Sequence, residues 1–316
     1  MNTIVYLFPG QASQYVGMGR ELFEKSERVR SFYSQASDLL GDDLARISFD
    51  GPAEMLKQTL FTQPAILIHS LALLELLADV LPRPAYAAGH SLGEYAALVS
   101  CGALSSEDAI TAVCTRARLM EDACRQKPGT MAAILALSDE KLDDVCRAAS
   151  AKGVVAMANI NSSLQVAVSG EKAAVEEACR LAKDAGAKRA LILEVGGAFH
   201  SPLMASATAG MAACLDTMTI KSANPPVVAN VTAEPVTHPD EIKRLLTAQI
   251  TSPVRWRDTM AFFMRQHISA AVEIGPGKVL TGLAKRDMEG ITLHNIDTLA
   301  DADELTAAIT RQGDEK

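Results

Sequence analysis

Residues 86–95 read Y-A-A-G-H-S-L-G-E-Y and contain the pattern G-x-S-x-G. Gly89 and Gly93 lack Cβ atoms, so the chain can turn sharply from a strand into a helix with Ser91 at the tip of the turn. The serine hydroxyl is then exposed at a helix N-terminus, where unpaired backbone N–H groups can stabilise an oxyanion. The pattern therefore predicts a nucleophilic serine. The alternative is an ordinary strand-to-helix turn with a serine that takes no part in chemistry.

The flanking residues agree with a strand and a helix on either side of Ser91. Residues 85–88 form a short apolar run after two prolines, which is typical of a buried strand end. Residues 94–101 are good helix formers, and Gly102 supplies a stop signal. His90 adjoins the serine but points elsewhere from a sharp turn, so we do not expect it to be the base.

The composition excludes several classes of protein. The net charge of −8 and the pI near 5.3 argue against a general nucleic-acid binder. No stretch is expected to cross a membrane. The six cysteines are scattered, without C-x-x-C pairs or zinc-like spacing, which indicates no metal site and a reducing cytoplasm. The turn at Gly275-Pro276-Gly277 resembles a phosphate loop but lacks its Ser/Thr and its first glycine, so no nucleotide site is predicted.

The residues before the serine motif predict one strand and one buried helix near Ser91. Residues 3–8 form an apolar strand, and Gln11 follows it on a loop at the expected ligand-binding end of an α/β sheet. An apolar run to Leu81 predicts a buried helix with Thr62 near its N-cap and Pro64 in its first turn. His69 lies within this run and is expected to be a hydrogen-bonded core residue.

The helix predicted from Ser105 to Cys124 carries a candidate for anion binding. Its apolar residues fall on one face at 100° per residue, and Arg116 lies on the border of that face. An arginine at such a border can pack its aliphatic stem and grip a carboxylate with two parallel hydrogen bonds. A surface ion pair with Glu121 or Asp122 is the alternative.

The segment from about residue 129 to 196 predicts an inserted small domain. Its pattern is strand, helix, strand, strand, helix, strand, the order of a ferredoxin-like βαββαβ unit. We therefore expect a discontinuous large α/β domain made of residues 1–128 and 197–316, with a central mainly parallel sheet, and a small domain of residues 129–196. His200 follows the return to the large domain, so it is expected at the cleft between the two and is a candidate base.

Eight motifs spread through the chain resemble one family. They are P-G-Q-A-S-Q (9–14), T-Q-P-A (62–65), G-H-S-L-G-E-Y (89–95), T-R-A-R-L-M (115–120), G-T-M-A-A-I (129–134), A-F-H-S-P-L-M (198–204), S-P-V-R-W (252–256) and E-I-G-P-G-K-V-L (273–280). In this order they resemble the malonyl-CoA:acyl carrier protein transacylases of bacterial fatty-acid synthesis. The resemblance implies an α/β-hydrolase-like large domain and a stand-alone enzyme that takes a malonyl group from malonyl-CoA and passes it to acyl carrier protein.

The resemblance also implies a role for each site residue. Ser91 would attack the thioester, His200 would be the general base, and the carbonyl oxygen of Gln249 would orient the histidine. Backbone N–H groups of Gln11 and Leu92 would form the oxyanion hole, and Arg116 would hold the malonyl carboxylate. The remaining residues of the cleft would be Gln63, Asn161 and Phe199, the last of which precedes the histidine as in malonyl-selective relatives. No cofactor or metal is implied, because CoA and phosphopantetheine arrive with the substrates.

Three other functions remain open on the sequence alone. The same serine could serve a thioesterase or other serine hydrolase, or a transacylase of a malonate decarboxylase or polyketide pathway. A scaffold that uses the fold for binding is the third, and it would need no nucleophile. We expect a monomer, and we expect an acidic carrier protein to dock on a basic patch, either Lys285 with Arg286 or Arg255 with Arg257.

Overall fold

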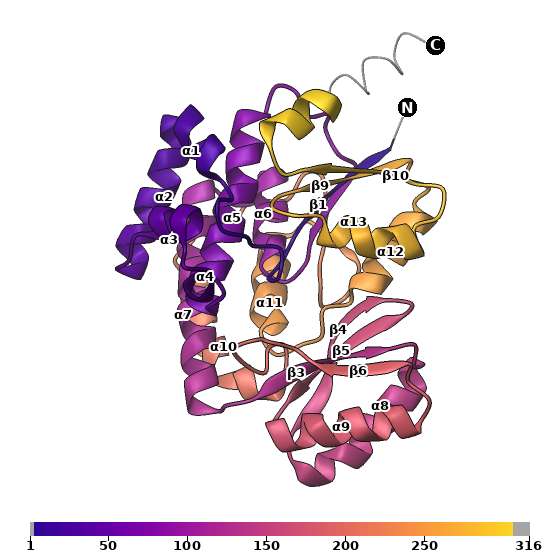
Figure 1. Ribbon diagram of the computed structural model, residues 1–316. Helices are drawn as coiled ribbons and strands as arrows, with labels where there is room; N and C mark the ends of the chain where they lie inside the picture. The colour runs from indigo at the N-terminus through magenta and orange to yellow at the C-terminus, as the bar shows by residue number, and fades with distance from the viewer. Residues whose placement is uncertain (1–2, 306–316) are drawn as a thin grey trace.

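Two β-sheets organise the computed structural model, which describes residues 3–305 (Figure 1). The larger sheet has six strands in the order β10-β9-β1-β2-β7-β8. Its strands are β1 (Ile4–Phe8), β2 (Tyr86–Gly89), β7 (Val227–Val228), β8 (Pro235–Val236), β9 (Ala270–Ile274) and β10 (Thr292–Ile296). All its neighbouring pairs are parallel except β7 with β8. The expected central, mainly parallel sheet is confirmed.

Helices cover both faces of this sheet because its inner strands are apolar on both faces. Along β1, Tyr6 and Phe8 belong to one core cluster, whereas Val5 and Leu7 belong to another. The first cluster includes helices α5 (Thr59–Leu76), α6 (Gly93–Ser100) and α7 (Ser106–Gln126). The second includes α12 (Trp256–Arg265) and α13 (Val279–Asp287). The sheet is therefore the middle of three layers.

Further helices pack on α5 or α7, with one exception. They are α1 (Arg20–Lys25), α2 (Glu27–Leu40), α3 (Leu44–Asp50), α4 (Ala53–Leu56), α10 (Ala205–Asp216) and α11 (Pro239–Gln249), with a 3₁₀ turn at Pro202–Met204. The exception is α11, which packs on α10. The strongest contacts of this group are α2 with α7 and α10 with α7. Helix α7 is thus held on several sides.

Helix α5 begins earlier than the sequence predicts. Its first residue is Thr59, and Pro64 lies inside the helix rather than in its first turn. The prediction of Thr62 as the N-cap is wrong, since its hydroxyl donates to the Leu56 carbonyl instead. In residues 3–305, α5 is the one helix whose length and hydropathy would suit a membrane span, which the sequence did not lead us to expect. Because 78% of it is buried in the protein, α5 is a core helix.

The second sheet has four antiparallel strands in the order β4-β5-β3-β6. Its elements follow one another as β3 (Thr130–Leu135), α8 (Asp139–Ala149), β4 (Val155–Ser162), β5 (Gln165–Gly170), α9 (Lys172–Asp184) and β6 (Arg189–Ile192), with a 3₁₀ turn at Ser150–Lys152. Figure 1 shows α8 and α9 on the face of this sheet that points away from the larger sheet. Their apolar residues form a core of their own with β3 to β6.

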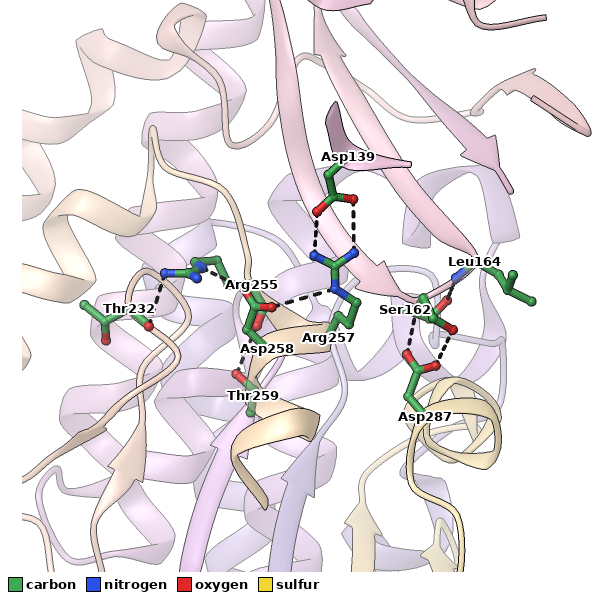
Figure 2. Close-up of polar contacts among 10 residues, drawn as sticks. Asp139, Ser162, Leu164, Thr232, Arg255, Arg257, Asp258, Thr259 and Asp287 are labelled. Atoms are coloured by element: carbon green, nitrogen blue, oxygen red, sulfur yellow. Dashed lines mark hydrogen bonds and ion pairs between the residues drawn. The ribbon is translucent and has the colours of Figure 1, made fainter. Parts of the chain in front are cut away.

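Hydrogen bonds connect the four-stranded sheet and its helix α8 to α12 and α13 (Figure 2). Arg257 at the start of α12 makes two hydrogen bonds to the carboxylate of Asp139, at 3.0 Å and 2.5 Å. Asp287 at the end of α13 accepts from the N–H and hydroxyl of Ser163, between β4 and β5. The backbone adds two bonds between β4 and Val254, Ile160 N–H to Val254 O and Val254 N–H to Ala158 O. These contacts hold the smaller sheet over the carboxyl ends of β1 and β2.

Candidate active site

Ser91 occupies a strained turn between β2 and α6, as the sequence predicts. Its φ is +54°, a left-handed conformation that is uncommon for serine. The two glycines of the motif allow the close approach, because a Cβ on Gly89 would lie 1.9 Å from the Gly93 carbonyl carbon. A Cβ on Gly93 would lie 2.2 Å from the Phe8 carbonyl oxygen. The glycines thus let α6 start against β1 and β2 with Ser91 at its tip.

Asn230 holds this turn in place. Its side-chain oxygen accepts from the Ser91 N–H at 2.7 Å, and its amide nitrogen donates to the Gly89 carbonyl at 2.7 Å. Asn230 comes two residues after β7, which is parallel to β2, so its side chain reaches the turn from the next strand. A buried amide that bonds the backbone on the N-terminal side of a strained residue can offset part of the conformational cost of that residue.

Ser91, His200 and Gln249 form a hydrogen-bonded chain. The Ser91 Oγ lies 2.8 Å from His200 Nε2, and His200 Nδ1 lies 2.8 Å from the backbone oxygen of Gln249. A carbonyl oxygen only accepts, so Nδ1 carries the hydrogen and Nε2 presents its lone pair to the serine hydroxyl. The order is that of a nucleophile, a base and an orienting group, with a backbone carbonyl in the place of a carboxylate.

His200 is neutral in this environment. The side chain is buried, and burial lowers the pKa of its imidazole to about 3, with the positive charge of Arg116 acting in the same direction. The bond to the Gln249 carbonyl raises the pKa by a smaller amount. A neutral imidazole aimed at a hydroxyl is ready to accept its proton.

Arg116 is a buried cation in the same cluster. Its guanidinium donates to the Ser91 Oγ at 2.9 Å, to the Gln249 side-chain oxygen at 2.9 Å and to the Gln63 side-chain oxygen. Within residues 3–305, no carboxylate oxygen lies within 4.0 Å of it, and its buried Nε has no hydrogen-bond partner. Burial lowers the pKa of Arg116. A buried guanidinium without an anion in contact is costly, so the site is suited to an anionic ligand.

Glu94 lies behind this cluster, one residue after the motif. It is buried on α6, and one carboxylate oxygen accepts from the Gln249 amide at 2.7 Å and from the Asn230 N–H at 3.2 Å. Burial raises the pKa of Glu94 to about 7, against the smaller lowering effects of its hydrogen bonds and of Arg116. Gln249 therefore stands between the buried carboxylate and the buried guanidinium.

One cavity of about 280 Å³ brings the predicted residues together. Of the residues predicted for the site, those that line the cavity are Ser91, His200, Arg116, Gln11, Leu92, Gln63, Asn161 and Phe199. Gln249 does not line it and bonds His200 and Arg116 from behind. The N–H groups of Gln11 and Leu92 donate no hydrogen bond to any part of the chain that the structure describes. Two free N–H groups beside the serine suit an oxyanion.

Both sheets contribute to this cavity. Asn161 and Gln165 come from β4 and β5, whereas Leu280 and Leu283 come from α13. The side-chain oxygen of Asn161 lies 3.0 Å from His90 Nε2, and because an amide oxygen only accepts, Nε2 is the donor. Burial lowers the pKa of His90. His90 therefore supports the cavity wall and does not contact the serine as a base, in agreement with the sequence prediction.

The charged residues expected at a docking surface differ in their surroundings. Arg257 is bound to Asp139, and Arg255 donates to Asp258 at 2.8 Å (Figure 2). Lys285 and Arg286 are exposed on α13, the helix whose Leu280 and Leu283 line the cavity. The second pair is therefore the better candidate for attracting an acidic partner.

Two residues of the cluster were missed by the sequence reasoning. No role is predicted for Asn230 from the sequence, and Glu94 is only one of the good helix formers of residues 94–101. The sequence did hold a signal for each. Asn230 is a polar residue at the carboxyl end of an apolar parallel strand, and Glu94 is an acid that opens the apolar helix A-A-L-V. The described residues contain no group of three or more His, Cys, Asp or Glu side chains that could hold a metal ion.

Comparison with known proteins gives a consistent family. The sequence model of the acyl transferase domain matches residues 5–305. The malonyl CoA-acyl carrier protein transacylase of Bacillus subtilis is 42% identical over 287 residues, 90% of each chain. That of Haemophilus influenzae is 41% identical over 301 residues, 94% of this chain and 96% of the relative.

Solved structures agree with the sequence relatives. The acyl carrier protein S-malonyltransferase of Vibrio cholerae superposes with a TM-score of 0.90 at 40% identity, covering 96% of this chain and 99% of the other. A malonyl-transacylase in complex with its type II polyketide synthase acyl-carrier protein has a TM-score of 0.90 at 37% identity, covering 95% and 98%.

Proposed function

Because the chain belongs to the acyl transferase domain family, we propose that it transfers a malonyl group from malonyl-CoA to the phosphopantetheine thiol of acyl carrier protein. The observation that carries this proposal is the contact of one serine hydroxyl with both a neutral histidine and a buried arginine. The histidine supplies nucleophilic chemistry, and the arginine supplies a reason for a substrate with a free carboxylate. The transfer serves fatty-acid elongation.

The first half of the reaction acylates the serine. His200 Nε2 takes the proton of the Ser91 hydroxyl as its oxygen attacks the thioester carbonyl carbon. The oxyanion that forms is bound by the N–H groups of Gln11 and Leu92, a contribution of about 3 kcal/mol per donor in comparable enzymes. The C–S bond then breaks, and the CoA sulfur leaves with the proton from His200.

The second half reverses these roles on a new thiol. The phosphopantetheine thiol of the carrier gives its proton to His200, and its sulfur attacks the malonyl-serine ester. The same N–H groups bind the second oxyanion. The C–O bond breaks, and Ser91 recovers its proton from His200. The covalent malonyl-serine ester separates the two half-reactions, and CoA leaves before the carrier thiol attacks, so the kinetics are ping-pong.

Arg116 provides the preference for malonyl groups. The malonyl carboxylate replaces neutral partners of the guanidinium with a bidentate ion pair in a buried setting. An acetyl group leaves the cation without an anion, which is unfavourable by comparison. Phe199 and the other apolar lining residues limit the size of the acyl group.

The intact mass of the protein after brief exposure to malonyl-CoA tests this function. We expect a malonyl adduct on the wild-type protein, little or none with acetyl-CoA, and none on Ser91→Ala. The adduct should disappear when phosphopantetheinylated acyl carrier protein is added, with the malonyl group recovered on the carrier. Malonyl retained on the protein in the presence of carrier would contradict the second half-reaction.

The same experiment separates the competing functions. A serine hydrolase would release CoA and free malonate without carrier, and the adduct would decay in buffer. A transacylase for a polyketide pathway or a malonate decarboxylase would discharge the same adduct to a different carrier. Presenting carriers from these pathways in parallel, at equal concentration, decides among them by their rates of discharge.

The pH dependence of serine reactivity tests the state of His200. We expect the rate of Ser91 modification by a neutral sulfonyl fluoride to be nearly constant from pH 8 to 5.5, because burial holds the pKa of His200 near 3 and the base stays neutral. If His200 had an ordinary pKa, the rate of Ser91 modification would fall about eightfold between pH 7 and 5.5. Reagent stability is measured without protein, and Ser91→Ala gives the background. An inflection near pH 6.5 would contradict the proposed state of the base.

We propose finer features of the molecule on the same grounds. The larger part, residues 1–128 and 197–316, is α/β-hydrolase-like, since its nucleophile follows a parallel strand at a sharp turn; residues 129–196 form a ferredoxin-like small domain, in keeping with their βαββαβ order. The protein acts as a cytoplasmic monomer without a bound cofactor. Support comes from the origin of all the site residues in one chain and from six free cysteines, five of them buried.

A further inference from the structure

Gln249 sits between two buried charges of opposite sign. Its side-chain oxygen accepts from Arg116 at 2.9 Å, and its side-chain nitrogen donates to Glu94 at 2.7 Å. A guanidinium only donates and an ionised carboxylate only accepts, so the two charges fix the direction of the amide between them. The nitrogen also donates to the Ser91 carbonyl at 3.0 Å, which favours the same orientation.

The orientation of this amide decides where the guanidinium of Arg116 is held. Gln249 and Gln63 present their side-chain oxygens to Arg116, one to each terminal nitrogen. A reversed Gln249 amide would turn its NH₂ group toward the guanidinium and repel it. Arg116 is buried and its Nε is unpartnered, so few other groups can keep it in place.

We propose that Glu94 is a positioning residue for malonyl recognition: through the Gln249 amide it aims Arg116 at the cavity and supplies the negative charge that balances the guanidinium until the substrate carboxylate arrives. This inference rests on the proposed function, because it concerns the same carboxylate site. Glu94 does not line the cavity, so we expect no contact between its side chain and the acyl group. Its effect must therefore appear in the selectivity that Arg116 provides.

Replacing Glu94 with glutamine tests the proposal. Glu94→Gln keeps the size of the side chain but removes its charge, and its own amide can then accept or donate toward Gln249. We expect the ratio of malonyl to acetyl acylation rates of Ser91 to fall about tenfold, the order of one charge-assisted hydrogen bond. We also expect the loss to appear in KM for malonyl-CoA more than in kcat. Glu94→Asp keeps the charge but shortens the side chain, so its ratio of malonyl to acetyl acylation rates should lie between those of the wild type and Glu94→Gln.

A simpler role for Glu94 makes a different prediction. An acidic residue in the first turn of a helix also stabilises that helix through its dipole. If that is the only role of Glu94, the Glu94→Gln substitution would lower the melting temperature. It would also lower the acylation rates with malonyl-CoA and acetyl-CoA equally, so their ratio would not change. Glu140→Gln, in the first turn of α8 and exposed, is the matched control for loss of such a charge, and its ratio should match the wild type.

The pH dependence of the ratio provides a test that needs no variant. Protonated Glu94 resembles glutamine, and burial raises its pKa to about 7, so the wild-type ratio should fall as the pH is lowered through 7. Taking the ratio removes the contribution of His200, which both donors use. Two other charged or titratable groups act on Glu94, namely Arg116 from α7 and Tyr95 from α6. The groups that face Glu94 from α11 and from the segment after β7 are neutral amides, those of Gln249 and Asn230. In Glu94→Gln the ratio should not change with pH.

The outcomes separate this inference from the proposed function. If Arg116→Ala abolishes the malonyl preference but Glu94→Gln and low pH leave it intact, the role of Glu94 is wrong and the proposed function stands. If neither substitution alters the preference, the carboxylate site itself is wrong. If Glu94→Gln does not fold, a wild-type ratio that stays constant from pH 8 to 6 still overturns the proposal.

Discussion

Alanine at position 91 is expected to lower malonyl transfer to the carrier by about 10⁵- to 10⁶-fold, as loss of the nucleophile does in serine enzymes of comparable geometry. The reason is that Ser91 Oγ is the only hydroxyl within hydrogen-bond distance of His200 Nε2 among the described residues. The measurement is the initial rate of malonyl-carrier formation at saturating malonyl-CoA. Replacing His200 with alanine should cost nearly as much, and the double variant little more, because the two residues act as one unit.

A neighbouring serine provides the control for this prediction. Ser100 ends the same helix, and its hydroxyl donates to the Ala97 carbonyl rather than to any residue of the site. Ser100→Ala should transfer malonyl at the wild-type rate. A Ser91→Ala protein that still forms a covalent malonyl adduct would place the nucleophile elsewhere.

Alanine at position 116 is expected to lower kcat/KM for malonyl-CoA by about 10²- to 10⁴-fold, since removing one partner of a buried ion pair costs about 3–5 kcal/mol. The rate with acetyl-CoA should change much less, because that donor has no carboxylate to lose. The malonyl preference therefore disappears mainly because kcat/KM for malonyl-CoA falls, not because kcat/KM for acetyl-CoA rises. Steady-state transfer with each donor, at matched carrier concentration, gives the two values.

Two further variants refine the Arg116 prediction. Arg116→Lys keeps the charge but not the planar fork that donates to two oxygens, so it should recover only part of the preference. Arg118→Ala removes an exposed arginine from the same helix, where it donates to the Leu39 carbonyl, and it should leave both donors unaffected. Full retention of the malonyl preference in Arg116→Ala would contradict the role assigned to the guanidinium.

The parts of the fold that depend on local sequence could be predicted well. The turn at Ser91 rests on two glycines whose neighbours leave no room for a Cβ, and those glycines are visible in the sequence. The strand Ala270–Ile274 is apolar at four of its five positions and ends at the turn Gly275-Pro276, both of which are visible in the sequence. The strand and helix order of residues 130–192 is the βαββαβ order that the sequence predicts.

The parts that depend on distant contacts could not be predicted in this way. Helix α5 starts five residues before Pro64, because its first turn is fixed by packing and by the Thr62 bond to Leu56 rather than by a capping residue. Strand β4 continues to Ser162 through two irregularities in its pairing with β5, which its sequence does not mark. The roles of Glu94 and Asn230 depend on bonds across 136 and 139 residues of sequence. No local pattern contains such a bond.

The separation of the site residues along the chain has a consequence for how the enzyme is made. Ser91 emerges from the ribosome long before His200, Asn230 and Gln249. At that stage the nascent chain has the serine but lacks the base His200, the Asn230 side chain that bonds its backbone and the Gln249 carbonyl that orients the base. Such a chain cannot acylate itself from the CoA thioester pool. The chemistry begins only when synthesis has passed residue 249 and the last helices have docked. A chain that ends before residue 249 is therefore expected to form no malonyl adduct.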